Sequence, residues 1–511
     1  MNRFGLLAVI AFAMLPGVQV SAKEPGPSRP NILMILSDDM GYSQPGFTGG
    51  NSELTPNLDA FAAEGMQLKQ FYTHSVCAPT RAAFLTGRYA FRTWSDWRSE
   101  DFGKPSYLAK LGLTLPTNEL GEKTRRIHAL DTEERTVAEA LRDVGYFTSI
   151  IGKWHCGEWL DEHLPMGQGF EHQYGHYAWG IDYNTFMIEH NAPVPFHVYD
   201  WHRNQRPINE TGYSTDLIAD ECIRVLKEQS ADRPFFIYVP FNAVHGPINV
   251  VPRYTDRYSV RDAALKCYDD AVGRILAALQ ETGLADNTLV MCTNDNGGLL
   301  EEMNRPFRGT KNTTFEGGVR VPCVVRWPGH TRAGSEHEPM MHIIDCFATF
   351  ATIAGGKVEA GPGRKMDSID MSETLFEGAP GPRDEIVFEV TGSVRVPTIR
   401  SGDYKLMGEL LFNIAEDPSE QHDVASEHPE IVQRLAKRLE ELAAERPPMG
   451  EKPLLMTPAL PYVYGQSENE SVPQWLKDRV DAARAKQPQS WPEGKTPWPK
   501  APQGISIDYS K

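Results

Sequence analysis

A single cysteine in an unusual setting is the first candidate for chemistry in this sequence. Cys77 lies in the stretch SVCAPTRAAFLTGR, Ser75–Arg88, and is followed closely by Pro79 and Arg81. Such a residue could be a disulfide partner, a metal ligand or a nucleophile. The chain has 7 cysteines in 511 residues, which is too sparse for a disulfide framework. The role of Cys77 therefore has to be decided by the residues elsewhere in the chain.

Polar side chains follow four predicted strands, each at the point where the strand ends. The apolar runs NILMIL, YFTSIIG, PFFIYVP and NTLVMCT have the length of buried strands. Because ligands bind at the carboxyl ends of strands in open α/β sheets, the residues after these runs are expected to meet. In chain order they are Asp38 and Asp39, Lys153 and His155, Asn242 and His245, and Asp295 and Asn296.

Each of these groups also has an explanation that involves no chemistry. Asp38 and Asp39 could cap a helix or form a turn, and the run NDNGG could be a hairpin turn. Lys153 and its neighbours could serve packing, and His245 could hold a loop by hydrogen bonds. These alternatives become less convincing because all of the groups fall at strand ends together.

The combined set has the chemistry of a site for a metal ion and an anion. Its carboxylate and amide groups offer only oxygen ligands, which favour Ca²⁺ or Mg²⁺ over zinc. Their spacing differs from that of a helical calcium loop, so the site would be assembled from distant strands. Lys153, Lys311 and Arg81 could hold an oxyanion together with the metal. His155 and His245 could move protons near neutral pH.

The elements that must position these residues alternate between apolar runs and helical patterns. This alternation predicts an α/β fold with a large mixed, mostly parallel sheet flanked by helices. From about Asp384 the runs EIVFEV, VRVPTIRSGDYKLM and ELLFNI predict a small antiparallel sheet, and PEIVQRLAKRLEELAAER predicts a helix. The predicted fold class is therefore α/β with a smaller C-terminal α+β subdomain.

Changes in composition and periodicity along the sequence also predict how the chain is divided into domains. A signal peptide is expected over 1–22, a catalytic α/β domain over 23–383 and the C-terminal subdomain over 384–446. Residues 447–511 form a Pro/Trp-rich extension with little periodicity, expected to pack on the surface through its tryptophans: Trp475, Trp491 and Trp498.

The N-terminus and the charge predict an exported protein. The stretch MNRFGLLAVIAFAMLPGVQVSA has one Arg, a short apolar run and small residues before Ala22, which is typical of a cleaved signal. No segment is long enough for a membrane span. A formal charge of -17 without a basic stripe argues against nucleic acid. A periplasmic or secreted protein is expected, and a bacterial one is favoured because a glycan at Asn312, beside Lys311, would be awkwardly placed.

The motifs around these residues resemble those of type I sulfatases, within the alkaline phosphatase superfamily. The family signature Cys-x-Pro-Ser/Ala/Thr-Arg, followed by Leu-Thr-Gly-Arg, is matched by Cys77–Arg81 and Leu85–Arg88. The blocks SDDMG, GKWH, HGP, NDNGG and RGTKNTTFEGGVRVP follow in the family's order. RSGDYKL and LFNIAEDPSEQHDVA resemble the family's second domain, so the resemblance covers roughly 30–446.

The resemblance implies an arylsulfatase-like sulfuric ester hydrolase with a modified nucleophile. In this family a maturation enzyme oxidises the motif cysteine, here Cys77, to formylglycine (3-oxoalanine). One hydroxyl of the hydrated aldehyde attacks sulfur, and the other then expels sulfate and regenerates the aldehyde. The implied ligands of the divalent cation, usually Ca²⁺ with Mg²⁺ as the alternative, are Asp38, Asp39, Cys77, Asp295 and Asn296.

The resemblance also implies a role for each of the remaining candidates. Arg81 would orient the modified residue, and Lys153 would bind both it and the sulfate. His155 would take the proton that triggers the elimination of sulfate. His245 would be the general acid at the leaving oxygen, with Lys311 beside it.

The region Lys153–Arg203 is crowded with aromatic residues and histidines, which would suit a sulfated sugar by stacking and hydrogen bonding. Ordinary packing explains any single one of these residues equally well. The polar segment Trp94–Glu134 is a candidate for part of the pocket wall. The candidate specificity residues are His172, His176, His202 and Arg203.

Three other functions remain open at this point. A small aryl sulfate could be the substrate, or the same nucleophile could serve a phosphonate monoester or phosphodiester hydrolase. A non-catalytic protein that binds sulfated glycans is the alternative of another class. An unmodified Cys77 would favour it, whereas the complete set of Lys, His and metal positions argues against it.

Overall fold

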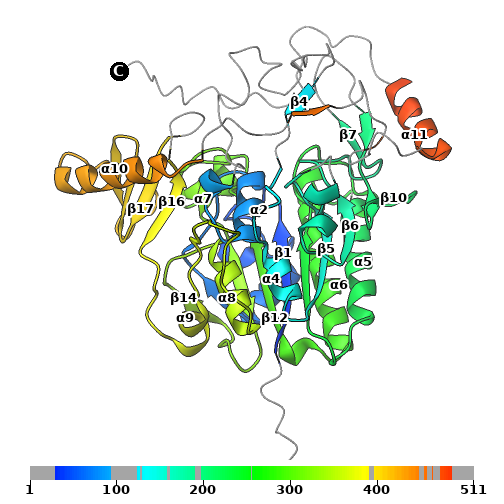
Figure 1. Cartoon of the computed structure of the whole chain (residues 1–511), viewed down its shortest axis with the longest axis horizontal. Coiled ribbons are helices and arrows are strands. Elements are labelled where there is room, and N and C mark those ends of the chain that lie inside the picture. The colour runs from blue at the N-terminus through cyan, green and yellow to red at the C-terminus, as the bar shows by residue number, and fades with distance from the viewer. Residues whose placement is uncertain are drawn as a thin grey trace, which may run out of the picture.

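The structure is a computed structural model. It contains a central sheet and a smaller C-terminal sheet (Figure 1). It describes residues 29–93, 124–126, 129–157, 161–189, 197–254, 256–390, 396–447, 454–456, 463 and 472–485. The central sheet has 10 strands in the order β10-β9-β6-β5-β11-β1-β12-β13-β2-β14.

The four apolar runs predicted as strands form the middle of the central sheet. They are β1 (Asn31–Ser37), β5 (Phe147–Lys153), β11 (Phe235–Pro240) and β12 (Thr288–Asn294). The strand β1 pairs in parallel with β11 and β12, and β11 pairs in parallel with β5. These strands are buried almost throughout, as expected for a parallel sheet covered on both faces.

The outer strands make the sheet mixed. The strand β6 continues the parallel pairing beside β5, whereas β13 and β9 run antiparallel to their inner neighbours. The outer strands are β2 (Met66–Leu68), β6 (His172–His176), β9 (His202–Arg203), β10 (Arg206–Pro207), β13 (Cys323–Arg326) and β14 (Ser335–His337). Short two-stranded pairs join β3 (Phe71–Tyr72) with β15 (Met341–His342), β4 (Thr124–Arg126) with β20 (Leu454–Met456), and β7 (Met187–Glu189) with β8 (His197–Tyr199).

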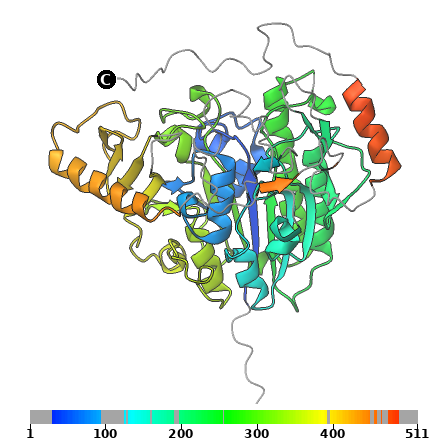
Figure 2. The same ribbon diagram turned by 45° about the horizontal axis from the view of Figure 1, so that its top comes forward.

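Two groups of helices cover the central sheet (Figures 1 and 2). One group contains α2 (Cys77–Thr86), α4 (Val137–Arg142) and α8 (Asp345–Ile353), which contact one another. The other contains α1 (Pro56–Glu64), α5 (Ser214–Lys227) and α6 (Val260–Glu281), in which α6 contacts both partners. The short helices α7 (Glu316–Val319) and α9 (Ser372–Glu377) follow β12 and α8.

The C-terminal sheet has four antiparallel strands in chain order. They are β16 (Glu385–Glu389), β17 (Thr398–Ser401), β18 (Tyr404–Met407) and β19 (Leu410–Asn413). The helix α10 (Pro429–Ala444) contacts β17 and β18 and buries the leucines of its apolar face: Leu435, Leu439 and Leu442. The fold class predicted from sequence is confirmed, and the exact domain boundaries stay a prediction.

The C-terminal extension contains a helix that the sequence reading missed. Residues Gln474–Ala485 form α11, which buries Leu476 and Val480 and lies beyond the small sheet in the chain. These two residues are four apart on one helical face, a signal too short to stand out between Pro-rich flanks. Trp475 makes the expected surface contact, with its ring 5.5 Å from that of Tyr199.

Some expectations concern parts of the chain outside the described residues. They are the signal peptide over 1–22, Trp491, Trp498 and most of the polar segment Trp94–Glu134. Among the helices that the structure describes, none is long and apolar enough to cross a membrane.

The end of β5 approaches β11 so closely that only glycine fits there. Gly152 has φ +136°, and a Cβ on it would lie 2.0 Å from the carbonyl oxygen of Pro240. Gly152 directly precedes Lys153, so the same contact fixes the start of a predicted site segment.

Replacing this glycine should destabilise the sheet. We expect Gly152→Ala to lower the free energy of unfolding by about 3 kcal/mol, because the added methyl group meets backbone that cannot move aside. Urea denaturation followed by circular dichroism measures this loss. Gly363→Ala is the control, since Gly363 also has a positive φ but has open space around it. It should cost about 1 kcal/mol, and equal losses for the two variants would contradict the packing argument.

Candidate active site

The four strand ends that carry polar residues meet at one edge of the central sheet. Their strands are neighbours in the order β5-β11-β1-β12 and run in the same direction. Backbone hydrogen bonds then tie the following segments together. Asp38 donates its N–H to the carbonyl oxygen of Ala243 at 2.8 Å, and Asp295 donates to that of Ser37 at 3.2 Å. The run NDNGG is thus a strand end at this edge, not a hairpin turn.

Three carboxylates lie together at this edge. Asp38, Asp39 and Asp295 each place a carboxylate oxygen within 4.8 Å of the others, and all three side chains are buried. Three like charges in a buried place are unfavourable unless cations compensate them.

Arg81 and Lys153 supply part of that compensation. Arg81 Nη2 lies 3.2 Å from Asp38 Oδ2 and 2.8 Å from Asp295 Oδ2, while its Nη1 donates to the carbonyl oxygen of Lys153 at 2.9 Å. Lys153 Nζ lies 2.5 Å from Asp38 Oδ2. Burial alone would raise the pKa of Asp38, but the charges of Lys153, His245 and Arg81 outweigh it and hold this pKa far below its ordinary value.

The negative charge of the third carboxylate, Asp295, is offset less fully by nearby cations than that of Asp38. Burial and the neighbouring charge of Asp38 raise the pKa of Asp295 to about 7, in spite of Arg81 and Lys153. Within the described part of the chain, the cations around the cluster therefore neutralise Asp295 incompletely.

Asp39 forms a second set of contacts on the other side of the cluster. Lys311 Nζ lies 2.6 Å from Asp39 Oδ1, and Asn296 Nδ2 donates to the same oxygen at 2.8 Å. His245 Nε2 lies 3.8 Å from Asp39 Oδ2. Burial opposes ionisation of Asp39, but the charges of Lys311 and His245 lower its pKa. Asp39 itself has φ +61°, a left-handed conformation that Asp tolerates better than most residues.

Two oxygen atoms of the cluster have no hydrogen-bond donor among the described residues. They are Asp38 Oδ1 and Asn296 Oδ1, and both are buried. Unpaired buried acceptors are uncommon in folded proteins and need an explanation. Together with the remaining carboxylate oxygens they form an all-oxygen donor set, which fits a hard divalent cation.

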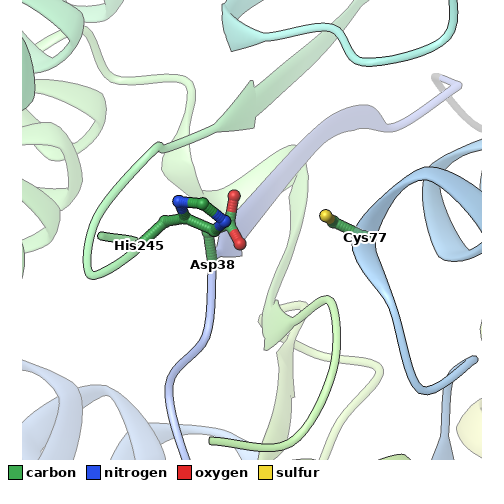
Figure 3. Close-up of side chains that lie close together, drawn as sticks. All are labelled: Asp38, Cys77 and His245. Atoms are coloured by element: carbon green, nitrogen blue, oxygen red, sulfur yellow. The ribbon is translucent and has the colours of Figure 1, made fainter. Parts of the chain in front are cut away.

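Cys77 lies next to this cluster at the first residue of α2. Its Sγ, a carboxylate oxygen of Asp38 and a ring nitrogen of His245 lie within 4.8 Å of one another. Figure 3 shows the sulfur pointing toward the other two side chains. Burial raises the pKa of the Cys77 thiol although Lys153 and Lys311 act in the opposite direction. The unmodified thiol is therefore protonated near neutral pH and is a poor nucleophile.

Two histidines lie near the charged residues of the cluster. His155 is partly buried, has φ +55° and leaves its buried Nδ1 without a described partner. His245 uses Nδ1 against the carbonyl oxygen of Gly246 at 2.5 Å, so its Nε2 faces the cluster. Burial and nearby cations lower both pKa values, that of His155 far below its ordinary value through Lys153 and Arg81, and that of His245 to about 4 through Lys311.

Of the four candidate specificity residues, two lie at or beside the end of β6 and are covered. His176 ends β6 and pairs in register with Lys153, and its side chain is fully buried. His202 stacks on Tyr177 with ring centroids 4.4 Å apart, and its Nδ1 lies 3.3 Å from Asp200 Oδ1. Neither ring presents an open face to a substrate.

The other two candidates are not brought to the site. His172 pairs in register with Ser149, four positions before the end of β5, and its Nε2 lies 3.1 Å from Glu221 Oε1. Arg203 Nη2 lies 2.8 Å from the other oxygen of Glu221. The ionic network around Glu221 accounts for both residues.

Sequence reasoning missed the residues that hold the candidates in place. Asn294 accepts the Met40 N–H at 3.2 Å and donates to the Met40 carbonyl oxygen at 2.6 Å, so it fixes the loop after β1. Tyr183 donates its hydroxyl to the carbonyl oxygens of Asn242 and His245, each at 2.8 Å. Asn294 is the first residue of NDNGG, and Tyr183 lies in the aromatic-rich region Lys153–Arg203, but neither pattern indicated these hydrogen bonds.

The guanidinium group of Arg81 should contribute to the stability of the protein as well as to the chemistry of the site. We expect Arg81→Lys to lower the free energy of unfolding by about 2 kcal/mol, because one ammonium group cannot reach both carboxylates and the Lys153 carbonyl. Urea denaturation in the presence of a chelator measures this. Arg88→Lys is the matched control, since Arg88 reaches both oxygens of Glu134 through Nη1 alone. A stability for Arg81→Lys that equals the control would contradict the bridging role.

Comparison with known proteins assigns this site to a family. The sulfatase family model matches residues 30–356. N-acetylgalactosamine-6-sulfatase of Mus musculus is 34% identical over 397 residues, 74% of this chain and 72% of that protein. Arylsulfatase A of Homo sapiens is 30% identical over 488 residues, 81% and 88% of the two chains.

A solved structure gives the same result. The crystal structure of Ps i-CgsB in complex with k-i-k-neocarrahexaose has a TM-score of 0.69 and 26% identity, and the match covers 82% of this chain and 94% of that one. The motifs, the fold and the relatives agree, and the chain belongs to the type I sulfatases, which are sulfuric ester hydrolases.

Proposed function

We propose that this sulfatase releases inorganic sulfate from a sulfated carbohydrate, with a formylglycine made from Cys77 and a divalent cation, Ca²⁺ by preference. The observation that carries the proposal is the position of Cys77 Sγ, within 4.8 Å of atoms of both Asp38 and His245. A thiol with a raised pKa has no evident use there, whereas an oxidised residue at the same position would face the cation ligands and a proton donor.

The cation would be held by the all-oxygen set of the cluster. Asp38 and Asn296 contribute the oxygens that lack donors among the described residues, and Asp39 and Asp295 complete the set together with the modified Cys77. Once bound, such an ion supplies Lewis-acid stabilisation of charge on the nucleophile and on the sulfuryl oxygens. Mg²⁺ is the alternative, because it prefers the same donors.

The side chains of the site would bind the sulfate ester, orient residue 77 and transfer the protons. A hydrated aldehyde supplies one hydroxyl that attacks sulfur and a second whose deprotonation releases sulfate. Arg81 orients residue 77, and Lys153 binds it and the sulfate oxygens. His155 takes the proton of the second hydroxyl. His245 gives a proton to the leaving oxygen once the negative charge of a bound sulfate ester raises its low pKa, and the ammonium group of Lys311 stabilises negative charge beside that oxygen.

Maturation must precede folding around Cys77. Its side chain is only 3% exposed, and all of α2 is buried. A separate maturation enzyme could therefore reach Cys77 only while this segment is still extended. We place the mature protein outside the cytoplasm, in the periplasm or secreted, on the basis of the signal-like N-terminus.

A sulfated saccharide is favoured by an aromatic side chain at the leaving-group side of the site. Trp179 is partly exposed, and its ring centroid lies 6.1 Å from that of His245. The neighbouring Tyr183 hydroxyl bonds to the His245 carbonyl oxygen, so the two loops are held together. A sugar ring that carries the ester would lie within reach of this tryptophan. The relative named N-acetylgalactosamine-6-sulfatase and the structure of Ps i-CgsB in complex with k-i-k-neocarrahexaose support the same substrate class.

The nucleophile can be tested by mass spectrometry and by sulfate release. After co-expression with a formylglycine-generating enzyme, the Cys77 peptide should carry the aldehyde, and Cys77→Ser should lower sulfate release by about a thousandfold or more. Removal of divalent ions with EGTA should abolish the wild-type activity, and added Ca²⁺ should restore it. Cys222→Ala, at a buried thiol on α5, should keep it.

Several outcomes would overturn the proposal. An unmodified Cys77 with no sulfate release from any sulfated oligosaccharide would favour a glycan-binding protein. Faster turnover of 4-nitrophenyl phosphate or a phosphonate ester than of 4-nitrophenyl sulfate would favour the phosphonate or phosphodiester hydrolase.

The substrate class has its own test at Trp179. We expect Trp179→Ala to raise KM for a sulfated oligosaccharide by about tenfold through loss of stacking, and to change KM for 4-nitrophenyl sulfate less. Trp475→Ala, at a partly buried tryptophan on α11, is the control and should change neither value. Equal effects of Trp179→Ala on both substrates would instead favour a small aryl sulfate.

A further inference from the structure

A lysine of the C-terminal sheet is buried between two carboxylates. Lys405 on β18 has no exposed side chain, and its Nζ lies 2.9 Å from Glu316 Oε1 and 2.9 Å from Glu420 Oε1. Both carboxylates are also fully buried. Glu316 begins α7 next to the central sheet, whereas Glu420 follows the small sheet in the chain. One cation thus joins carboxylates from both parts of the structure.

Glu316 is the most constrained member of this group. Its Oε2 accepts the Tyr72 hydroxyl at 2.7 Å and lies 3.4 Å from Arg320 Nη1. Its backbone N–H donates to Glu420 Oε2 at 2.6 Å. Burial and the charge of Glu316 raise the pKa of Glu420 to about 7, which shows how much the pair depends on Lys405 as its shared cation.

The residues before Glu316 pack on the small sheet. Phe315 forms an apolar cluster with Met407 and Phe412 of β18 and β19, and the hydroxyls of Thr314 and Thr398 lie 2.7 Å apart. In Figure 1, α7 lies beside β16 and β17 and near α2. The small sheet therefore sets the position at which α7 starts.

The start of α7 in turn touches the backbone next to a proposed metal ligand. Gly297 directly follows Asn296, and a Cβ on Gly297 would lie 1.8 Å from the carbonyl oxygen of Gly317. Gly297 also donates its N–H to the Gly318 carbonyl oxygen at 3.0 Å. Asn296 Nδ2 donates to the Gly297 carbonyl oxygen at 2.9 Å. These two backbone segments are in direct contact. A shift of Glu316 would therefore move the Asn296 side chain.

The same helix start supports the loop of Lys311. A Cβ on Gly318 would lie 2.1 Å from the carbonyl oxygen of Thr313 and 2.6 Å from that of Thr310. Lys311 donates its N–H to the Gly298 carbonyl oxygen at 3.0 Å. Both the amide ligand and this lysine are thus built on the backbone that Glu316 anchors.

We propose that Lys405 is a positioning residue for the sulfatase reaction, because through Glu316 it fixes the backbone that carries Asn296. The small sheet then serves the site through a buried ionic contact, although Lys405 does not touch the carboxylate cluster. This inference rests on the proposed function, in which Asn296 is a metal ligand. Mutation of residues that orient metal ligands without touching the metal commonly costs about 10–100-fold in metal affinity or activity.

Calcium binding to the full chain tests this role directly. We expect Lys405→Met to raise the Kd for Ca²⁺, measured by isothermal titration calorimetry, by about tenfold. The fall in kcat/KM should reside mainly in kcat. The double variant Lys405→Met/Glu420→Gln should recover part of the Ca²⁺ affinity, because it removes one of the two carboxylates left without their cation. Tyr72→Phe, which removes one hydrogen bond from Glu316, should raise the Kd by about threefold and serves if Lys405→Met does not fold.

Arg383→Met is the matched control. Arg383 leads into the small sheet and forms an equally buried pair with Asp345, Nε to Oδ2 at 2.5 Å, away from α7. It should lower the melting temperature without changing the Kd. Wild-type Ca²⁺ affinity in folded Lys405→Met, or in Tyr72→Phe when that is the variant used, would overturn the inference. So would a loss of affinity in Arg383→Met that matches the loss in Lys405→Met. A wild-type chain that binds no Ca²⁺ would instead overturn the proposed metal site.

Discussion

The concentration of negative charge at one buried edge of the sheet is the constraint on which the rest of the site depends. Asp38, Asp39 and Asp295 lie within 4.8 Å of one another without contact with solvent. Three cationic side chains from separate segments offset these negative charges: Arg81, Lys153 and Lys311. In the proposed function the same cations would hold a sulfate ester once a divalent ion compensates the carboxylates, so one charge balance would serve both stability and catalysis.

The fold supplies this arrangement through parallel strands. Because β5, β11, β1 and β12 end at the same edge, residues more than a hundred positions apart become neighbours without long loops. Close backbone contacts at Gly152 and Gly297 then leave little freedom to the segments that follow. The C-terminal sheet adds a third support by docking on α7 through Phe315 and Lys405.

Much of the fold and of the proposed chemical centre could be predicted from the sequence. The apolar runs marked the central strands, and the motif around Cys77 marked the family. Buried partners could not be predicted in this way. His172 and Arg203 were expected near the substrate because of their residue types, but their partner Glu221 lies on α5, and pairing between segments so distant leaves no local pattern. Lys405 was overlooked for the same reason, since its partners come from two other segments.

The central claim, that a divalent cation binds at the carboxylate edge, is tested most directly by anomalous scattering from crystals grown with Ca²⁺. We predict one strong peak at the carboxylate edge of β1 and β12, from a Ca²⁺ ion that has Asp38 Oδ1 and Asn296 Oδ1 among its ligands. An edge without a peak, in which Arg81 and Lys153 alone neutralise the carboxylates, would contradict it.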